Sequence, residues 1–356
     1  MADPDQQAIW QQYCPTPLAL DGDHITLAHG EGGRLMRKLI GERIIPTLGG
    51  DVLSSLSDAA PLPAIAGELA MTTDSFVVSP LFFPGGDIGS LAVNGTVNDL
   101  AVSGARPLYL TLSLILEEGL PISVLDRVLQ SVAAAAVGGG VQVVAGDTKV
   151  VPRGAADGLF INTTGVGQLS KPIVAGPTAL GEGDELIVSG PIGRHGMAVL
   201  CAREQLALEP PPTSDSAPLA TAAEALRERL GPRLRAMRDA TRGGVAAVLH
   251  EWAEACGLTM SIRDHDVPVS ADVRGACELL GLDPLHVANE GTMVVAVEPG
   301  SGQAALEVLH ALPGTAGATL IGQVTLRQLA PVTIQRTLGS EQPLDEPLGA
   351  MLPRIC

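Results

Sequence analysis

The stretch GGDIGSLAVNGTVNDLAVSGA, residues 85–105, decides how the chain is interpreted. Its apolar face has helical spacing and consists of Ile88, Leu91, Ala92 and Gly95. This periodicity predicts a helix over 87–103, with Asn94 and Asn98 on one side and Asp99 at the edge of that side. Two amides and a glycine weaken a helix interior, the glycine by about 1 kcal/mol against alanine. A stable helix of this composition therefore indicates a ligand or a close packing partner.

Strands and helices are predicted to alternate on both sides of this stretch, which is typical of a mixed α/β fold. Strictly alternating leucines at 108–116 predict a strand with one buried face. Further strands are predicted at 68–79, 141–146, 159–168, 185–189, 258–263, 292–298 and 318–325. Further helices are predicted at 122–137, 195–206, 218–230, 243–256 and 302–312. The segment LEPPPTSDSA at 208–217 is expected to be a flexible surface loop.

A length of 356 residues is typical of two domains. The Gly- and Pro-rich segment 171–185 is the predicted boundary between them. We expect an irregular glycine-containing segment at 1–40, a first domain at 41–170, a second α/β domain at 171–335 and a mobile tail at 336–356.

The net charge of −17 excludes binding to nucleic acid or to an acidic membrane by bulk attraction. A phosphorylated ligand would need metal ions or backbone N–H groups to reverse the local charge. The first residues lack the apolar region of a signal peptide, and no apolar run is long enough for a membrane span. The five cysteines show no metal-binding spacing and indicate a reducing compartment: Cys14, Cys201, Cys256, Cys277 and Cys356. We therefore expect a cytoplasmic protein.

Four aspartates share a local setting, each at a predicted junction or helix end among small residues: Asp58, Asp74, Asp99 and Asp147. Mg²⁺ prefers a few carboxylates together with phosphate oxygens and water. The set therefore fits Mg²⁺-mediated nucleotide binding. The alternative is that these residues cap helices and close turns.

Three other motifs carry groups suited to chemistry. Lys149 follows Asp147 on the same side of a predicted strand, where it could contact a phosphate, transfer a proton or simply be solvated. Asp239 and Arg242 lie in DATRGG, a glycine-rich turn before a helix, and such helix N-termini bind anions. Glu290 precedes an apolar strand, so it is either a turn residue or a buried base with a raised pKa.

The sequence ends in LPRIC, which places the thiol of Cys356 beside the terminal carboxylate. Chain ends are mobile unless something holds them. A thiol on such a tether can enter an active site, visit a partner enzyme and return. The alternative is that a cysteine stands at the end by accident.

These motifs together resemble the HypE family of hydrogenase maturation factors. The resemblance covers nearly the whole chain and rests on HGEGG (29–33), DAA (58–60), TTDS (72–75), the stretch 85–105, AGDTKVV (145–151), RDATRGGVA (238–246), ANEGT (288–292) and LPRIC (352–356). The helix motif is typical of the superfamily that includes aminoimidazole ribonucleotide synthetase, selenophosphate synthetase and thiamine-phosphate kinase. The terminal cysteine distinguishes HypE from these sister enzymes.

The resemblance implies two α/β domains, of which the first binds ATP and pairs through its sheet in a homodimer. It implies that a partner carbamoyltransferase, HypF, carbamoylates Cys356. The chain would then use ATP to dehydrate the S-carboxamide to an S-cyanide. The cyanide would pass to iron held by the maturation proteins HypC and HypD, and become an Fe–CN ligand of [NiFe]-hydrogenase.

The resemblance also implies which residues form the site. ATP would be bound by Asp58, Asp74, Asn94, Asn98, Asp99, Asp147, Asp239 and Arg242. Mg²⁺ would be held by Asp58, Asp74, Asp99 and Asp239. Glu290 and Lys149 would surround the Cys356 thiol, Glu290 as the base for the N–H protons. Glu31 stands in the glycine cluster where a small polar residue is expected, and an acid there is unsuited to direct phosphate contact.

Two alternatives remain open. Selenophosphate synthetase chemistry would require a reactive cysteine and lysine near the N-terminus, and Cys14 has no lysine before Lys38. The chain could also be a non-catalytic carrier whose Cys356 accepts a group that other proteins process. ATP hydrolysis that depends on a modified Cys356 would separate an enzyme from a carrier.

Overall fold

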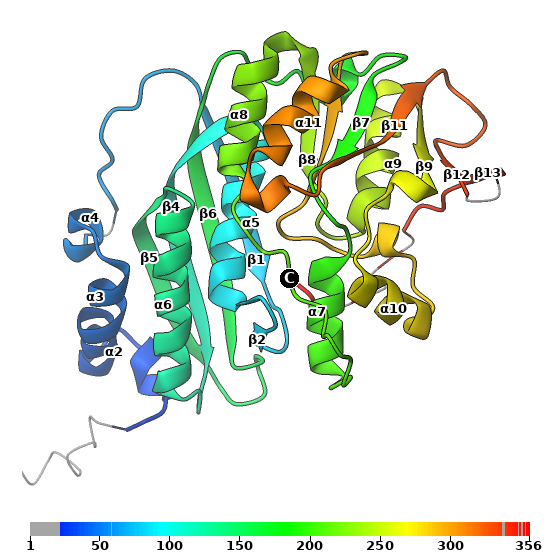
Figure 1. Ribbon diagram of the computed structural model, residues 1–356. Coiled ribbons are helices and arrows are strands. Elements are labelled where there is room, and N and C mark those ends of the chain that lie inside the picture. The colour runs from blue at the N-terminus through cyan, green and yellow to red at the C-terminus, as the bar shows by residue number, and fades with distance from the viewer. Residues whose placement is uncertain (1–21, 58, 337–338, 348, 350–351, 353) are drawn as a thin grey trace, which may run out of the picture.

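The computed structural model describes residues 22–57, 59–336, 339–347, 349, 352 and 354–356. Within these ranges the chain forms two α/β halves, and the C-terminus lies between them (Figure 1). Cys14 and Asp58, which the sequence analysis singled out, lie outside the described residues. No helix in the described ranges is long and apolar enough to cross a bilayer.

The first half is built on a four-stranded sheet with the strand order β1-β6-β4-β5. Its strands are β1 (Leu69–Phe76), β4 (Ala105–Glu117), β5 (Gln142–Val151) and β6 (Leu159–Leu169). One face is covered by α5 (Ile88–Val102) and α6 (Ile122–Gly138) (Figure 1). The alternating leucines of β4 point into this layer, where Leu110, Leu112, Leu114 and Leu116 are buried. The predicted half-buried strand is therefore confirmed.

A short helical segment lies at the β5 edge of this sheet. It consists of the 3-10 turn η1 (Leu27–Gly30), α2 (Arg34–Leu39), the π-helical η2 (Ile40–Ile44), α3 (Ile45–Leu48) and α4 (Asp51–Ser54). Irregular structure was expected up to residue 40, which is wrong from Leu27 onward. The reason is tertiary packing, because Leu39 and Ile44 are buried in the core beneath the sheet.

The second half contains a seven-stranded sheet with the order β13-β12-β9-β11-β7-β10-β8. Its strands are β7 (Glu185–Val188), β8 (Leu234–Asp239), β9 (Thr259–Arg263), β10 (Met293–Val297), β11 (Thr319–Thr325), β12 (Val332–Gln335) and β13 (Glu341–Pro343). Its helices are α7 (Arg194–Arg203), α8 (Ala220–Leu230), α9 (Gly244–Cys256), α10 (Ala271–Leu280) and α11 (Gly302–His310). A two-residue ribbon, β2 (Phe82–Phe83) with β3 (Gly86–Asp87), belongs to the first half. The mixed α/β fold class is thus confirmed.

Helix α5 lies at the centre of the molecule and explains the unusual composition of the stretch 85–105. Asp87 caps it, accepting hydrogen bonds from the backbone N–H groups of Gly89 and Ser90. A Cβ at Gly95 would lie 2.9 Å from the Phe76 ring, so the glycine permits a close contact with β1. Thirteen of its fifteen residues are buried. The single apolar face predicted for this helix covers too little of its buried surface, because both halves of the protein pack on this helix.

The segment 208–217 and the tail differ from expectation. Ser214 is buried, so the expected flexible surface loop is in part a packed connection. In the tail, Glu341–Pro343 forms strand β13 beside β12, and Ile355 is only 4% exposed. The expectation of little structure at 336–356 is therefore wrong for these residues. The core that Ile355 joins lies far away in sequence, and β13 is an exposed strand, so neither gives a local signal.

Candidate active site

Acidic side chains from five parts of the chain converge where the two halves meet. They are Asp74 on β1, Asp99 on α5, Asp215 in the loop before α8, Asp239 at the end of β8 and Glu290 before β10, with Cys356 of the tail beside them. Figure 1 shows the C-terminus reaching this junction next to β1 and α7. The predicted residues Asp74, Asp99, Asp239, Glu290 and Cys356 are thus brought together.

Two of these aspartates have strongly perturbed acidity. Burial, and then the charge of Asp99, raise the pKa of Asp74 to about 6 against the opposing effect of Arg242. Burial, and then Asp99, raise the pKa of Asp239 to about 7. Asp99 accepts a 2.7 Å hydrogen bond from the Thr72 hydroxyl, which fixes its carboxylate beside β1. Close carboxylates with so little positive charge form a site prepared for a cation.

Glu290 is the most deeply placed acid of the group. It is 3% exposed, and burial followed by the charges of Asp239 and Asp215 raises its pKa well above the usual value. Its backbone is held firmly, because Asp215 accepts hydrogen bonds from the N–H groups of Glu290 and Gly291 and from the Thr292 hydroxyl. Glu290 therefore lies in a bend and is also buried, and its role as a base stays a prediction.

The last three residues are held against the first half of the protein. The N–H of Val77 donates to an oxygen of the terminal carboxylate of Cys356 at 3.1 Å, and that of Ser79 donates to the Arg354 carbonyl at 3.3 Å. Arg354 also pairs with Asp157. Burial, and then the charge of Glu290, raise the pKa of the Cys356 thiol to about 12. The docked thiol is therefore protonated and weakly nucleophilic at neutral pH.

Arg242 brings positive charge to this acidic region. It stands before α9, its charge partly offsets the rise in the pKa of both Asp74 and Cys356, and it lines a cavity of about 430 Å³. The same cavity is bordered by Gly243 at the start of α9 and by Leu352 and Ile355 of the tail. A positive side chain and a helix N-terminus next to a cavity are suited to an anionic ligand.

The two asparagines of α5 have different environments. Asn98 uses its whole amide inside the protein: it donates to the carbonyls of Ala217 and Glu290 and accepts from the N–H of Leu219. Asn94 donates to the Ser216 hydroxyl at 3.2 Å, but its side-chain oxygen is buried without a partner. Buried polar atoms rarely remain unsatisfied, so this oxygen is an acceptor available to a ligand.

Asp147 and Lys149 are not part of this cluster within one chain. They form an ion pair of 3.0 Å with each other on β5, with side chains 54% and 62% exposed. Strand β5 is the opposite edge of the sheet from β1, three strand spacings or about 14 Å away. Neither residue is among the groups that shift the pKa of Cys356.

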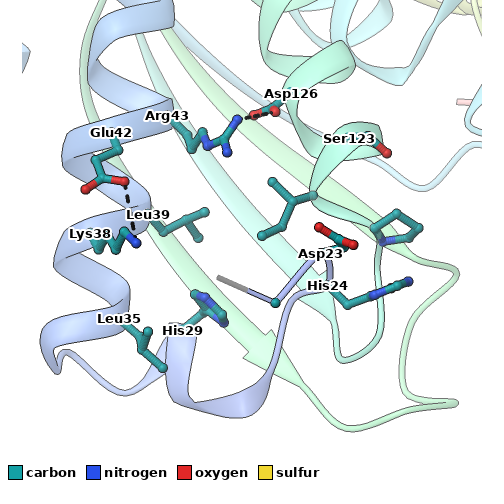
Figure 2. A pocket seen from close by; sticks show the side chains of 13 residues that line it. Asp23, His24, His29, Leu35, Lys38, Leu39, Glu42, Arg43, Ser123 and Asp126 are labelled. Carbon is teal, nitrogen blue, oxygen red and sulfur yellow. Dashed lines mark hydrogen bonds and ion pairs between the residues drawn. The ribbon is translucent and has the colours of Figure 1, made fainter. Parts of the chain in front are cut away.

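A second cavity lies away from the acidic cluster (Figure 2). Its volume is about 640 Å³, and it is lined by the N-terminal helical segment and the start of α6. Two ion pairs lie within it, Arg43 with Asp126 at 2.7 Å and Lys38 with Glu42 at 3.9 Å. It contains none of the perturbed acids, so the chemistry is better placed at the junction.

Among the described residues, no group of three or more His, Cys, Asp or Glu side chains has the geometry to hold a metal ion by itself. Mg²⁺ bound through a nucleotide needs only one or two carboxylates from the protein. The four cysteines that the structure describes are free thiols.

Three residues at this junction were missed by the sequence analysis: His195, Ser214 and Asp215. His195 is a lone histidine in a helix, and the other two lie in a Pro-rich segment that predicts an exposed loop. A signal was available in the pair Ser214–Asp215, since both are suited to capping backbone N–H groups.

The two halves correspond to two known domain families. Residues 56–169 match the family described as AIR synthase related protein, N-terminal domain, and residues 181–333 match AIR synthase related protein, C-terminal domain. The fold and the site between these domains therefore define an AIR synthase-related protein.

More similar relatives narrow this class. The chain is 47% identical over 339 residues to the carbamoyl dehydratase HypE of Escherichia coli (strain K12), covering 94% of this chain and all of that protein. It also superposes on a crystal structure of the hydrogenase maturation protein HypE in complex with ATP, with a TM-score of 0.88, 42% identity and coverage of 93% and 99%. A structure of a HypE–HypF complex matches with a TM-score of 0.77, 43% identity and coverage of 88% and 100%. The chain belongs to the HypE family.

Proposed function

We propose that this protein is an ATP-dependent carbamoyl dehydratase of [NiFe]-hydrogenase maturation, which converts the S-carboxamide on its own Cys356 to an S-cyanide. The observation that carries the proposal is the position of Cys356. The tail places its thiol beside a buried glutamate, Glu290, and an acidic cluster. Relatives named carbamoyl dehydratase, at up to 47% identity over nearly their whole length, support the same activity.

The residues at the junction fit ATP and Mg²⁺. The unpartnered oxygen of Asn94 offers a hydrogen-bond acceptor to a ligand, and Arg242 offers a cation to a phosphate. Asp74 and Asp239 have raised pKa values because negative charges gather there, and a divalent cation would relieve that repulsion. We propose that Mg²⁺ bound with the nucleotide takes one or two of the carboxylates of Asp74, Asp99 and Asp239 as ligands. Asp58, which the sequence analysis added to this set, stays a prediction.

In the proposed reaction the carbamoyl oxygen leaves as part of phosphate, the nitrogen loses both protons and a C≡N bond remains on sulfur. ATP supplies the phosphoryl group that makes the oxygen a leaving group, and Mg²⁺ balances its charge. Glu290 receives one N–H proton, and the other leaves with the phosphate. Glu290 is a stronger base than an exposed carboxylate because burial raises its pKa. The tail and the core around Ile355 exclude water from the reacting group.

This arrangement favours an enzyme over a non-catalytic thiol carrier. A carrier has no need of a buried base next to its thiol. It also has no need of carboxylates whose pKa values are raised at a cost in stability.

We further propose a homodimer formed through the outer face of the four-stranded sheet. This face is the one opposite α5 and α6, and it carries apolar side chains without cover, including Met71 at 75% and Leu69 at 52% exposure. Lys149 pairs with Ile115 in the parallel register of β5 and β4 and therefore points to the same face. A second copy packed there would bring its Lys149 toward this chain, which offers a way for Lys149 to reach Cys356.

A HypE–HypF complex is known for a similar protein, and we propose the carbamoyltransferase HypF as the partner that modifies Cys356. HypC and HypD are proposed as the iron-carrying acceptors of the cyanide. The cytoplasmic location and the domain limits expected from the sequence stay predictions.

The test is the intact mass of the purified chain after incubation with HypF, carbamoyl phosphate and ATP, with mapping of the C-terminal peptide. A carbamoyl gain on Cys356, followed by loss of one water only when ATP is present, is the expected result. A carbamoyl group that persists although ATP binds would identify a carrier. If Cys356 is never modified, both the dehydratase and the thiol-carrier hypothesis are wrong.

A further inference from the structure

A buried histidine that takes no part in the proposed chemistry touches the end of the tail. His195 lies in the first turn of α7 and is fully buried. Its Nε2 is 2.6 Å from the carbonyl oxygen of Ile355. A carbonyl only accepts hydrogen bonds, so Nε2 carries the proton in this contact.

The other ring nitrogen is held as well. Nδ1 of His195 is 2.8 Å from the hydroxyl of Ser214. Because Nε2 carries the proton, Nδ1 of the neutral ring accepts from this hydroxyl. Ser214 Oγ in turn accepts from the N–H of Ser216, and the Ser216 hydroxyl accepts from the Asn94 amide. A continuous set of hydrogen bonds therefore joins helix α5 to the last peptide group of the chain.

The loop that carries Ser214 has little freedom to move. The N–H of Ser214 donates to the carbonyl of Pro84 at 2.9 Å. A Cβ at Gly85 would lie 2.7 Å from the Ser214 carbonyl oxygen, and one at Gly291 would lie 1.8 Å from that of Asp215. The backbone of this loop is thus packed directly on two glycines, which fixes the position of the Ser214 hydroxyl.

The histidine ring is fixed by its neighbours in the same way. Phe83 presents its ring edge-on at 5.3 Å between centroids and at 87°. A Cβ on the next residue, Gly196, would lie 2.6 Å from the Val287 side chain and 3.1 Å from that of Leu352. Burial lowers the pKa of His195 and keeps the ring neutral, as its acceptor role toward Ser214 requires.

The geometry of the tail explains why a donor is needed at this point. The backbone N–H groups of Ser79 and Val77 donate to the carbonyl of Arg354 and to the terminal carboxylate of Cys356. The carbonyl between them, that of Ile355, is bonded instead to Nε2 of His195 in the other half of the protein. A buried carbonyl without a partner costs free energy, and His195 supplies its donor.

We propose that His195, oriented by Ser214, is a positioning residue that docks the C-terminal segment and so places the sulfur of Cys356 beside Glu290. This inference rests on the proposed function, since it assigns the device that presents the carbamoylated thiol to the site. The competing view is that His195 only ties α7 to the loop before α8. In that case its loss would lower stability without a specific effect on Cys356.

The experiment compares the full-length chain with three variants at His195 and Ser214 and with one matched control. His195→Ala removes the donor, His195→Gln keeps a side-chain N–H, and Ser214→Ala removes the group that orients the ring. The control, His310→Ala, deletes a similar 2.8 Å contact from a histidine to the Ala318 carbonyl away from the tail. Three quantities are measured: the alkylation rate of Cys356 by iodoacetamide, the single-turnover loss of water from pre-carbamoylated Cys356, and the affinity for ATP.

We expect His195→Ala to raise the alkylation rate of Cys356 by about 10-fold or more, because the undocked thiol regains ordinary acidity. Dehydration should slow by about 100-fold, since a reacting group displaced by about 1 Å loses a factor of that size. ATP affinity should stay within about 2-fold of the wild type, corresponding to less than 0.5 kcal/mol. His195→Gln should restore most of the wild-type alkylation and dehydration rates. Ser214→Ala should show the same two changes more weakly than His195→Ala, and His310→Ala should show neither.

Two results would overturn the proposal. One is an unchanged alkylation rate in His195→Ala, and the other is faster alkylation without slower dehydration. If His195→Ala does not fold, Ser214→Ala decides by the same two criteria. If the wild-type chain itself fails to dehydrate its carbamoylated Cys356, the proposed function is wrong, and the alkylation rates still decide whether His195 docks the tail.

Discussion

At the scale of single residues, Glu290 combines deep burial with a position beside the reacting thiol. Glu290→Gln keeps the size of the side chain and removes its ability to accept a proton. We expect dehydration of carbamoylated Cys356 to fall by about 10²- to 10⁴-fold, the usual contribution of a general base. Carbamoylation by HypF and binding of ATP should persist. Single-turnover mass spectrometry measures the rate.

A matched control for this substitution is Glu298→Gln. Glu298 follows β10 and pairs with Arg235 at the surface, 44% exposed. It should leave dehydration unchanged, because surface ion pairs contribute little and this one lies outside the site. An equal loss of dehydration rate in both variants would show that Glu290 is not the base of the reaction.

Asp239 provides a test of the electrostatic cost of the site. Its folded pKa is raised to about 7 from an ordinary value of 3.8, so the protonated form is the one that the fold favours. The stabilising effect of that proton is complete below pH 3.8 and is lost as the pH rises through 7. The nucleotide-free protein should therefore melt at a lower temperature at pH 8 than at pH 5.5.

Asp239→Asn removes this titration. The variant should be more stable than the wild type at pH 8, and the difference should shrink toward pH 5.5. It should also bind Mg²⁺ and ATP less tightly. Thermal unfolding at the two pH values measures the effect, and a gain that is equal at both would rule out the ionisation of Asp239 as its cause.

The residues of the site were predicted from sequence with unequal success, and the reason is local context. Asp74, Asp99, Asp239 and Glu290 lie in short motifs of small residues, and such motifs can be recognised in the sequence alone. His195 is invisible in this way because its partner, the Ile355 carbonyl, is 160 residues distant.

At the scale of elements, α5 shows how packing overrides helix propensity. Gly95→Ala would normally stabilise a helix by about 1 kcal/mol. Here the added methyl would lie 2.9 Å from the Phe76 ring. We expect a net destabilisation of about 1–3 kcal/mol, the usual cost of overpacking. Urea unfolding of the variant and the wild type measures it.

Gly138→Ala is the control for this substitution, because Gly138 ends α6 and a Cβ there meets nothing within 4 Å. It should be neutral or slightly stabilising. A Gly95→Ala protein as stable as the wild type would mean that the α5–β1 contact is not tight.

The elements that sequence periodicity predicted best are those with one partner layer, such as β4 and α6. Strands β8, β12 and β13 were not predicted. Strands β12 and β13 have only four and three residues, and β13 is exposed along its whole length, so no apolar alternation marks it. Their pairing depends on the neighbouring strand β9 and on one another. Sequence patterns detect burial, and the exposed strand β13 depends on hydrogen bonding at a sheet edge instead. Strand β12 is buried at Val332 and Ile334, but four residues are too few to give a periodic pattern.

At the scale of the whole molecule, the isolated chain leaves Lys149 on the outer face of the sheet, remote from Cys356. The resemblance to HypE placed both residues at one site. A homodimer through this face reconciles the two, because each site would then take Cys356 from one protomer and Lys149 from its partner. In that arrangement neither residue has to move along the sheet.

Mixed dimers test this arrangement. Lys149→Ala and Cys356→Ala should each be inactive as homodimers, the first for lack of the charge and the second for lack of the thiol. When the two are co-expressed, half of the dimers are mixed, and one of the two sites in each mixed dimer has both residues. Activity should therefore return to about a quarter of the wild-type value. If Lys149 acts within its own chain, every site lacks one residue and co-expression restores nothing. If the Lys149→Ala homodimer is itself active, the lysine is dispensable for the reaction, and its ion pair with Asp147 is then only a structural contact.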